Sequence, residues 1–130
     1  MELITDHLAR CVATLEASIE LLGRSRQESI EYEVYRNAVV KGFELCLETA
    51  GKLLRKALRE YVASPRSIDE LSYKDVFREA LRRGFVADEA EVRRWFEYRD
   101  NRNSTAHDYG IGFAEATLGL LAHFLADVKR

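Results

Sequence analysis

The residues best suited to chemistry lie in one polar stretch, residues 98–109, between two strongly amphipathic segments. Within it, Arg102 supplies a guanidinium that can stabilise charge on phosphoryl oxygens. His107 supplies an imidazole that can take or give a proton near neutral pH. Arg99 and Tyr109 add a second cation and a phenol within a few residues. These residue types at this spacing suit reactions at phosphate esters.

Helical geometry limits how these side chains can meet. On a straight helix, Arg102 and His107 diverge by roughly 140°, whereas Asn103 and His107 share a face. The arginine and the histidine therefore converge only if the helix breaks at residues 103–105 or if two copies of the chain meet. Asn, Ser and Thr compete with helical hydrogen bonding, which favours a break there. A histidine at a helix start can also be a cap or lie in solvent, so the spacing alone leaves its role open.

The segments that must position these residues are helical. Apolar residues recur every three or four positions from residue 2 to 22, and again from Gln27 to the Ser64–Pro65 pair. The second segment spans about 36 residues, or roughly 54 Å as a helix. Because this is long for a small domain, we expect part of it to pack on another chain. Gly42 and Gly51 within it would allow a bend or a close helix contact.

Three further helices are predicted. Two helix-start patterns precede a short helix that ends at Gly84, a residue suited to a left-handed cap. Asp88 caps the next helix with Glu91 as its capping-box partner, and the last helix covers about residues 113–128. No segment shows the alternation of a strand. The sequence therefore predicts one all-α domain over residues 1–130, an antiparallel up-and-down four-helix bundle with one additional short helix.

Composition and charge exclude several classes of protein. Hydrophobic residues make up 47% of the chain and the net charge is -2, so bulk charge does not point to nucleic acid or membrane. No apolar run approaches the roughly 20 residues of a membrane span, and the N-terminus lacks a signal-peptide pattern. We therefore expect a cytoplasmic protein. Cys11, Cys46 and three scattered histidines form no ligand pattern, so we expect buried free thiols, no metal site and no cofactor.

Other polar and aromatic residues are expected to have structural roles. We expect His123 to be partly buried and hydrogen-bonded, and Trp95 and Phe96 to belong to the core. The arginine pairs 82–83 and 93–94 are expected to lie on solvated faces, although they could also hold a nucleic-acid backbone or an acidic partner.

The pattern Arg102-x4-His107-x-Tyr109 resembles the motif of the HEPN superfamily, the higher eukaryote and prokaryote nucleotide-binding domains. The chain is most similar to small bacterial members encoded beside a minimal nucleotidyltransferase. The resemblance covers nearly the whole chain. Further matching positions are Phe43–Glu44, Ala80, Gly84–Val86, Trp95 and Asn103.

The resemblance implies a function for the polar stretch. Some members of this group are called nucleotidyltransferase substrate-binding proteins, and others are the toxin halves of toxin–antitoxin pairs. A toxin-like chain would be a metal-independent endoribonuclease, in which His107 assists attack by the ribose 2′-hydroxyl or protonates the leaving oxygen. Arg102 would stabilise the transition state, Asn103 would orient the phosphate or the histidine, and Arg99 would help to bind substrate. In the toxins, the residue matching Tyr109 receives adenylate from the partner.

The resemblance leaves the subgroup open, because residues 103–105 are similar to the substrate-binding proteins and residues 107–109 to the toxins. The competing hypothesis is a non-catalytic subunit that binds a nucleotide or another substrate for the nucleotidyltransferase. A third is a purely structural dimer. The resemblance further implies a homodimer with paired motifs in a shared cleft, and RNA or a nucleotide as ligand. Tyr109 could alternatively cap the last helix and pack against Trp95.

Overall fold

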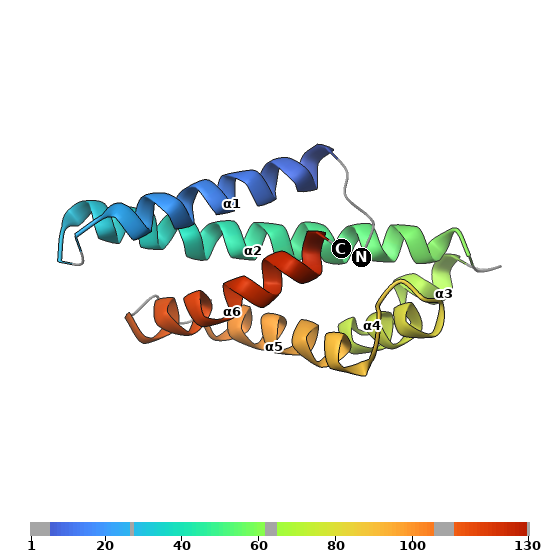
Figure 1. The fold of residues 1–130 in the computed structure, drawn as a ribbon. Helices are drawn as coiled ribbons and strands as arrows, with labels where there is room; N and C mark the ends of the chain where they lie inside the picture. The colour runs from blue at the N-terminus through green and yellow to red at the C-terminus, as the bar shows by residue number, and fades with distance from the viewer. Residues whose placement is uncertain (1–5, 27, 62–64, 106–110, 130) are drawn as a thin grey trace.

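The computed structural model describes residues 6–26, 28–61, 65–105 and 111–129, and every regular element in these ranges is an α-helix. The helices are α1 (Asp6–Arg24), α2 (Ile30–Arg59), α3 (Pro65–Asp69), α4 (Tyr73–Arg82), α5 (Glu89–Thr105) and α6 (Ile111–Lys129). The four long helices alternate in direction along the chain, as Figure 1 shows. The all-α, up-and-down prediction is confirmed, but two short helices stand where one was predicted.

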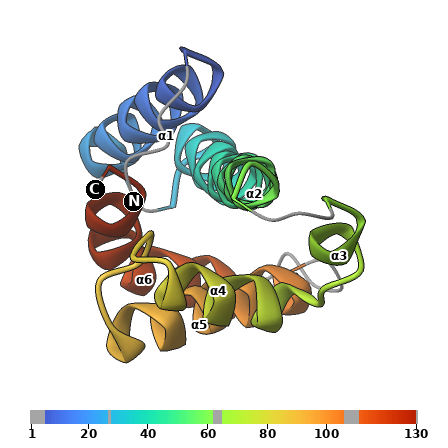
Figure 2. The ribbon, with the colours of Figure 1, turned by 90° about the vertical axis from the view of Figure 1, so that its right-hand side faces the viewer.

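Helix α2 is the centre of this bundle. It packs against each of the other five helices, and Figure 2 shows them arranged around it. It starts at Ile30 rather than near Gln27, because Ser29 caps the start by accepting a hydrogen bond from the Tyr32 N–H at 3.0 Å. It ends at Arg59, a few residues before the predicted end at the Ser64–Pro65 pair. The buried side chains of α2 are Val39, Val40, Phe43, Glu44, Cys46, Leu47, Ala50, Leu54 and Leu58.

The two glycines of α2 meet different surroundings. A Cβ atom at Gly42 would lie 3.2 Å from Leu15 Cδ1, so this glycine lets α1 approach α2 closely. The predicted close helix contact is therefore confirmed at Gly42. A Cβ atom at Gly51 would meet nothing within 4 Å, so no helix contact requires a glycine there.

The connection between α4 and α5 contains the glycine turn and the helix cap that the sequence predicts. Gly84 has φ +79°, and the Phe85 N–H donates to the Ala80 carbonyl at 2.9 Å, which completes a left-handed helix end. Asp88 then accepts from the Glu91 N–H at 2.9 Å, so the predicted cap is confirmed. The left-handed helix end at Gly84 and the Asp88 cap together set the direction of α5 relative to α4.

The core side of α5 begins with a buried carboxylate. The side chain of Glu91 is fully buried and accepts hydrogen bonds from the indole N–H of Trp95 at 3.0 Å and the Ala87 N–H at 3.2 Å. Trp95 is also fully buried and stacks on Phe77, with ring centroids 5.1 Å apart. Its predicted core position is confirmed, whereas Phe96 is only partly buried.

A second buried carboxylate joins α5 to α6. Arg94 donates two hydrogen bonds to Asp127, at 2.8 and 2.9 Å, and the Tyr98 hydroxyl donates a third at 2.5 Å. Burial, and then the hydrogen bond to Asp127, raises the pKa of Tyr98, so the phenol remains a donor at neutral pH. The expectation that Arg94 lies on a solvated face is therefore wrong, because its guanidinium is held by Asp127.

Several smaller expectations have mixed outcomes. Cys46 is buried and burial raises its pKa to about 12, whereas Cys11 is only partly buried; both thiols are free. His123 is exposed, so the expected partly buried position is wrong. No helix among the described residues has the length and apolar character needed to cross a membrane.

The Arg94–Asp127 contact generates a stability prediction. Replacing Arg94 with alanine takes the cation away from a carboxylate that is 4% exposed, and we expect the free energy of unfolding to fall by about 3 kcal/mol. Arg93→Ala is the matched control, because Arg93 is 78% exposed and pairs with Glu89 only at 4.0 Å. Urea unfolding of this control should agree with the wild type within about 0.5 kcal/mol. Equal losses in both variants would contradict a special role for the pair.

Candidate functional site

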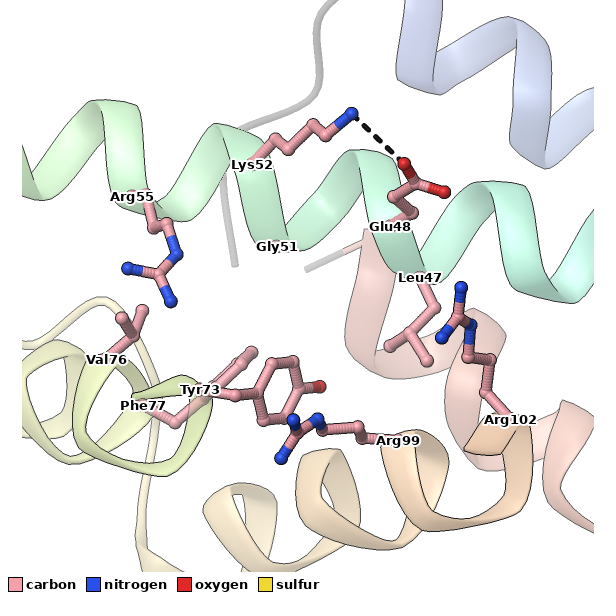
Figure 3. A pocket seen from close by; sticks show the side chains of 10 residues that line it. All are labelled: Leu47, Glu48, Gly51, Lys52, Arg55, Tyr73, Val76, Phe77, Arg99 and Arg102. Carbon is pink, nitrogen blue, oxygen red and sulfur yellow. Dashed lines mark ion pairs between the residues drawn. The ribbon is translucent and has the colours of Figure 1, made fainter. Parts of the chain in front are cut away.

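A pocket of about 340 Å³ lies between α2, α4 and α5. Figure 3 shows its walls, with α2 along one side and α4 and α5 along the other. The lining residues are Leu47, Glu48, Gly51, Lys52, Arg55, Tyr73, Val76, Phe77, Arg99 and Arg102.

The inner wall of the pocket is apolar and fixed in place. Leu47, Val76 and Phe77 are buried core residues that also border the pocket. The Tyr73 hydroxyl donates to the Trp95 carbonyl at 3.0 Å, which ties the ring to α5. Burial raises the pKa of Tyr73, so its phenol stays protonated and keeps this hydrogen bond at neutral pH.

The rim of the pocket is cationic. The Arg99 guanidinium lies 4.9 Å from the centre of the Tyr73 ring, a cation–π contact. Lys52 Nζ lies 3.0 Å from a carboxylate oxygen of Glu48. The hydrogen bond from Lys52, and more weakly the charge of Arg102, lowers the pKa of Glu48. One ionised carboxylate thus stands among cations that can bind phosphate oxygens.

Arg55 shapes one end of the pocket. It donates hydrogen bonds to the carbonyls of Ile68 at 3.0 Å and Leu71 at 2.9 Å. These bonds hold the segment between α3 and α4 against α2, and Figure 3 shows the guanidinium in the space between α2 and α4. Arg55 therefore adds positive charge while fixing the wall that carries Tyr73 and Val76.

The structure brings two of the predicted site residues together. Arg99 and Arg102 are exposed on α5 and both line the pocket. Asn103 lies in the last turn of α5, with its side chain outside the described residues, and His107 and Tyr109 also lie outside them. The meeting of Arg102 with His107 therefore stays a prediction.

The helix break expected at residues 103–105 is wrong, because α5 continues through Thr105. Near this end, the Asn101 amide donates to the Thr117 hydroxyl at 2.8 Å and so ties α5 to α6. Thr117 is fully buried, and this contact supports the helical path of the last turn.

Sequence reasoning missed the contribution of α2 to the site. Glu48, Lys52 and Arg55 follow one another at helical spacing, and Gly51 lies on the same side of α2. The available signal in the sequence was Gly51. A glycine among polar residues on one side of a helix is not explained by contact with a buried residue. Among the described residues, no three His, Cys, Asp or Glu side chains are placed to hold a metal ion.

Comparisons with known proteins agree on the family of this chain. The sequence profile of the family described as "Nucleotidyltransferase substrate binding protein like" matches residues 5–130. A "Probable ribonuclease HepT" of Haemophilus influenzae is 31% identical over 101 residues, which cover 78% of this chain and 67% of that protein.

A solved structure from the same organism supports the match. It is described as the fold of a substrate binding domain of a nucleotidyltransferase, and it superposes with a TM-score of 0.81 at 25% identity. The match covers 95% of this chain and 92% of that one. The HEPN resemblance is thereby confirmed, and the chain belongs to the family of nucleotidyltransferase substrate binding protein-like domains.

Proposed function

We propose that this chain is the HEPN partner of a small nucleotidyltransferase, in a two-gene pair of the toxin–antitoxin kind, and that it is a metal-independent endoribonuclease. The ribonuclease name of the 31% identical relative supports the activity, and the family description supports the partner. The observation that carries the proposal is the position of Arg102, which lies in the last turn of α5, lines a cationic pocket and precedes the segment with His107.

The proposed reaction is cleavage of RNA by its own 2′-hydroxyl. The 2′-oxygen attacks the neighbouring phosphorus, its proton passes to a base, and the bond from phosphorus to the 5′-oxygen breaks. The leaving oxygen takes a proton, so the products are a 2′,3′-cyclic phosphate and a 5′-hydroxyl. His107 acts in one of the two proton transfers. Arg102 stabilises the charge on the phosphoryl oxygens, and Asn103 orients the phosphate or the histidine.

The second candidate function is a non-catalytic subunit that binds a nucleotide or another substrate for the nucleotidyltransferase. The pocket favours it, because an apolar wall with four cationic side chains can bind a phosphorylated ligand without catalysis. Cleavage of RNA by the purified protein separates the two candidates.

We also propose that the protein is a homodimer. Four apolar side chains of α1 and α2 stay exposed in the single chain: Leu21, Ile30, Val34 and Leu45, with exposed fractions of 41, 80, 56 and 46%. Two of them, Ile30 and Val34, are one turn apart at the start of α2. Their exposure supports the expectation that this half of the long helix packs on another chain.

Variants of the motif test the ribonuclease. Arg102→Ala and His107→Ala should each lower the rate of RNA cleavage by roughly a hundredfold or more, because each removes a charge-stabilising or proton-transferring group. Chelator should leave the rate unchanged. Matched controls are Arg93→Ala and His123→Ala, which alter exposed residues outside the motif and should cleave at the wild-type rate. Cleavage that survives both motif changes would remove the assignment, and cleavage that needs a metal would point to another enzyme.

Sedimentation tests the dimer. The wild type should sediment as a dimer at micromolar concentration, and Val34→Glu should shift it toward the monomer because it places a charge on an apolar interface. Val34→Ile keeps the apolar surface and should remain dimeric. A monomeric wild type would contradict the proposal.

Intact-protein mass spectrometry tests Tyr109. The phenol oxygen would attack the α-phosphate of ATP on the partner nucleotidyltransferase and release diphosphate. The protein should therefore gain the mass of adenylate when it is incubated with the partner and ATP, and RNA cleavage should fall because a phosphate and a base are added near Arg102. Tyr109→Phe should gain no mass, whereas Tyr61→Phe, which alters an exposed tyrosine just beyond the end of α2, should gain it as the wild type does. A gain that persists in Tyr109→Phe would place the modification elsewhere.

A further inference from the structure

We infer that the pocket between α2, α4 and α5 is a subsite that receives one unpaired nucleotide of the RNA substrate. This inference rests on the proposed ribonuclease function and adds the form of RNA that the site accepts. The residues that carry it are Gly51, Lys52, Tyr73, Arg99 and Arg102.

The size of the pocket suits a single nucleotide. Its volume of about 340 Å³ lies at the lower end of the range of small-ligand pockets. A paired base cannot enter such a pocket without leaving its helix, so an unpaired nucleotide is the form of RNA that fits.

The walls of the pocket match the two parts of a nucleotide. The apolar side offers Leu47, Val76 and the part of Tyr73 that its contacts with Arg99 and Phe77 leave uncovered to a base. The rim offers Lys52 from α2 and Arg99 from α5 to phosphates. Figure 3 shows cationic groups on both sides of this apolar wall. A base placed there would have its neighbouring phosphates within the cationic rim.

The number of cationic side chains around the pocket favours an RNA strand over a single phosphate group as the ligand. The pocket is lined by four cationic side chains and one carboxylate, a formal sum of +3 from Lys52, Arg55, Arg99, Arg102 and Glu48. Successive phosphates of a strand can be spread over such a rim. Arg102 also belongs to the proposed catalytic motif, so a nucleotide in the pocket would lie close along the strand to the bond that is cut.

Gly51 adds no side chain to the α2 wall of the pocket. Glycine in a helix interior is less favourable than any residue except proline. A Cβ atom at this position would meet nothing within 4 Å, so helix packing does not account for the glycine. The empty volume beside the backbone lies inside the pocket, where a ligand can use it.

The test compares two glycine variants. Gly51→Leu fills the pocket with an apolar side chain, and leucine is a better helix former than glycine, so the fold should persist. Gly23→Leu is the matched control, because Gly23 is also helical and a Cβ atom there also meets nothing within 4 Å. Circular dichroism and thermal melting check that both variants fold.

The main measurement is fluorescence anisotropy with a labelled single-stranded RNA of about 10 nucleotides. The wild type should bind this strand more tightly than the same sequence in a duplex. Gly51→Leu should weaken binding about tenfold or more because the base loses its pocket, and Gly23→Leu should bind as the wild type does. Glu48→Gln should strengthen binding severalfold, because it removes a negative charge from the rim.

The outcomes separate this inference from the proposed function. If Gly51→Leu binds and cleaves RNA as the wild type does, the subsite is wrong and the ribonuclease proposal stands. If the wild type binds the strand with the expected variant pattern but cuts nothing, the ribonuclease proposal fails and the subsite stands. If AMP or ATP binds more tightly than the strand and loses its site in Gly51→Leu, the pocket takes a free nucleotide and the RNA assignment is overturned. Weaker binding by Glu48→Gln would also overturn it.

Discussion

Burial of one long helix on several sides is the constraint on which this fold depends. Helix α2 contacts all five other described helices, and its buried residues occur on more than one face. Apolar burial of about 25 cal/mol per Å² drives this arrangement. The other helices are therefore placed by where they can cover α2, as Figure 2 shows. Near Gly51, a pocket lies between α2, α4 and α5.

Two buried carboxylates then set how α5 lies on this scaffold. Glu91 holds the indole of Trp95 beside α4, and Asp127 holds Arg94 and Tyr98 beside α6. A buried carboxylate requires hydrogen-bond donors nearby, so each pair fixes α5 more narrowly than apolar contact would. The rotation of α5 about its own axis is thereby determined, and with it the direction in which its polar residues point.

The fold could be predicted from the sequence because its signals are local. The three- and four-residue apolar spacing, Gly84 and the Asp88 cap all act within a few residues. The site could be predicted only in part, because Arg102 belongs to a recognisable motif and Arg99 lies one turn before it, while Lys52 and Arg55 come from a helix some 45 positions away. Arg94 was misjudged for the same reason, since its partner Asp127 is distant in sequence and only the tertiary fold brings them together.

The residue spacing of α5 links the positions of its buried side chains to the positions of Arg99 and Arg102. Residues 91, 95 and 98 are separated by four and three positions, which makes one buried stripe. Arg99 follows Tyr98 by one position, about 100° around the helix, and Arg102 lies one turn beyond Arg99. Both arginines must then border the pocket whenever Tyr98 reaches Asp127. A change that rotated α5 would therefore move the cationic rim and the start of the motif together, so the buried hydrogen bonds position arginines that they do not contact.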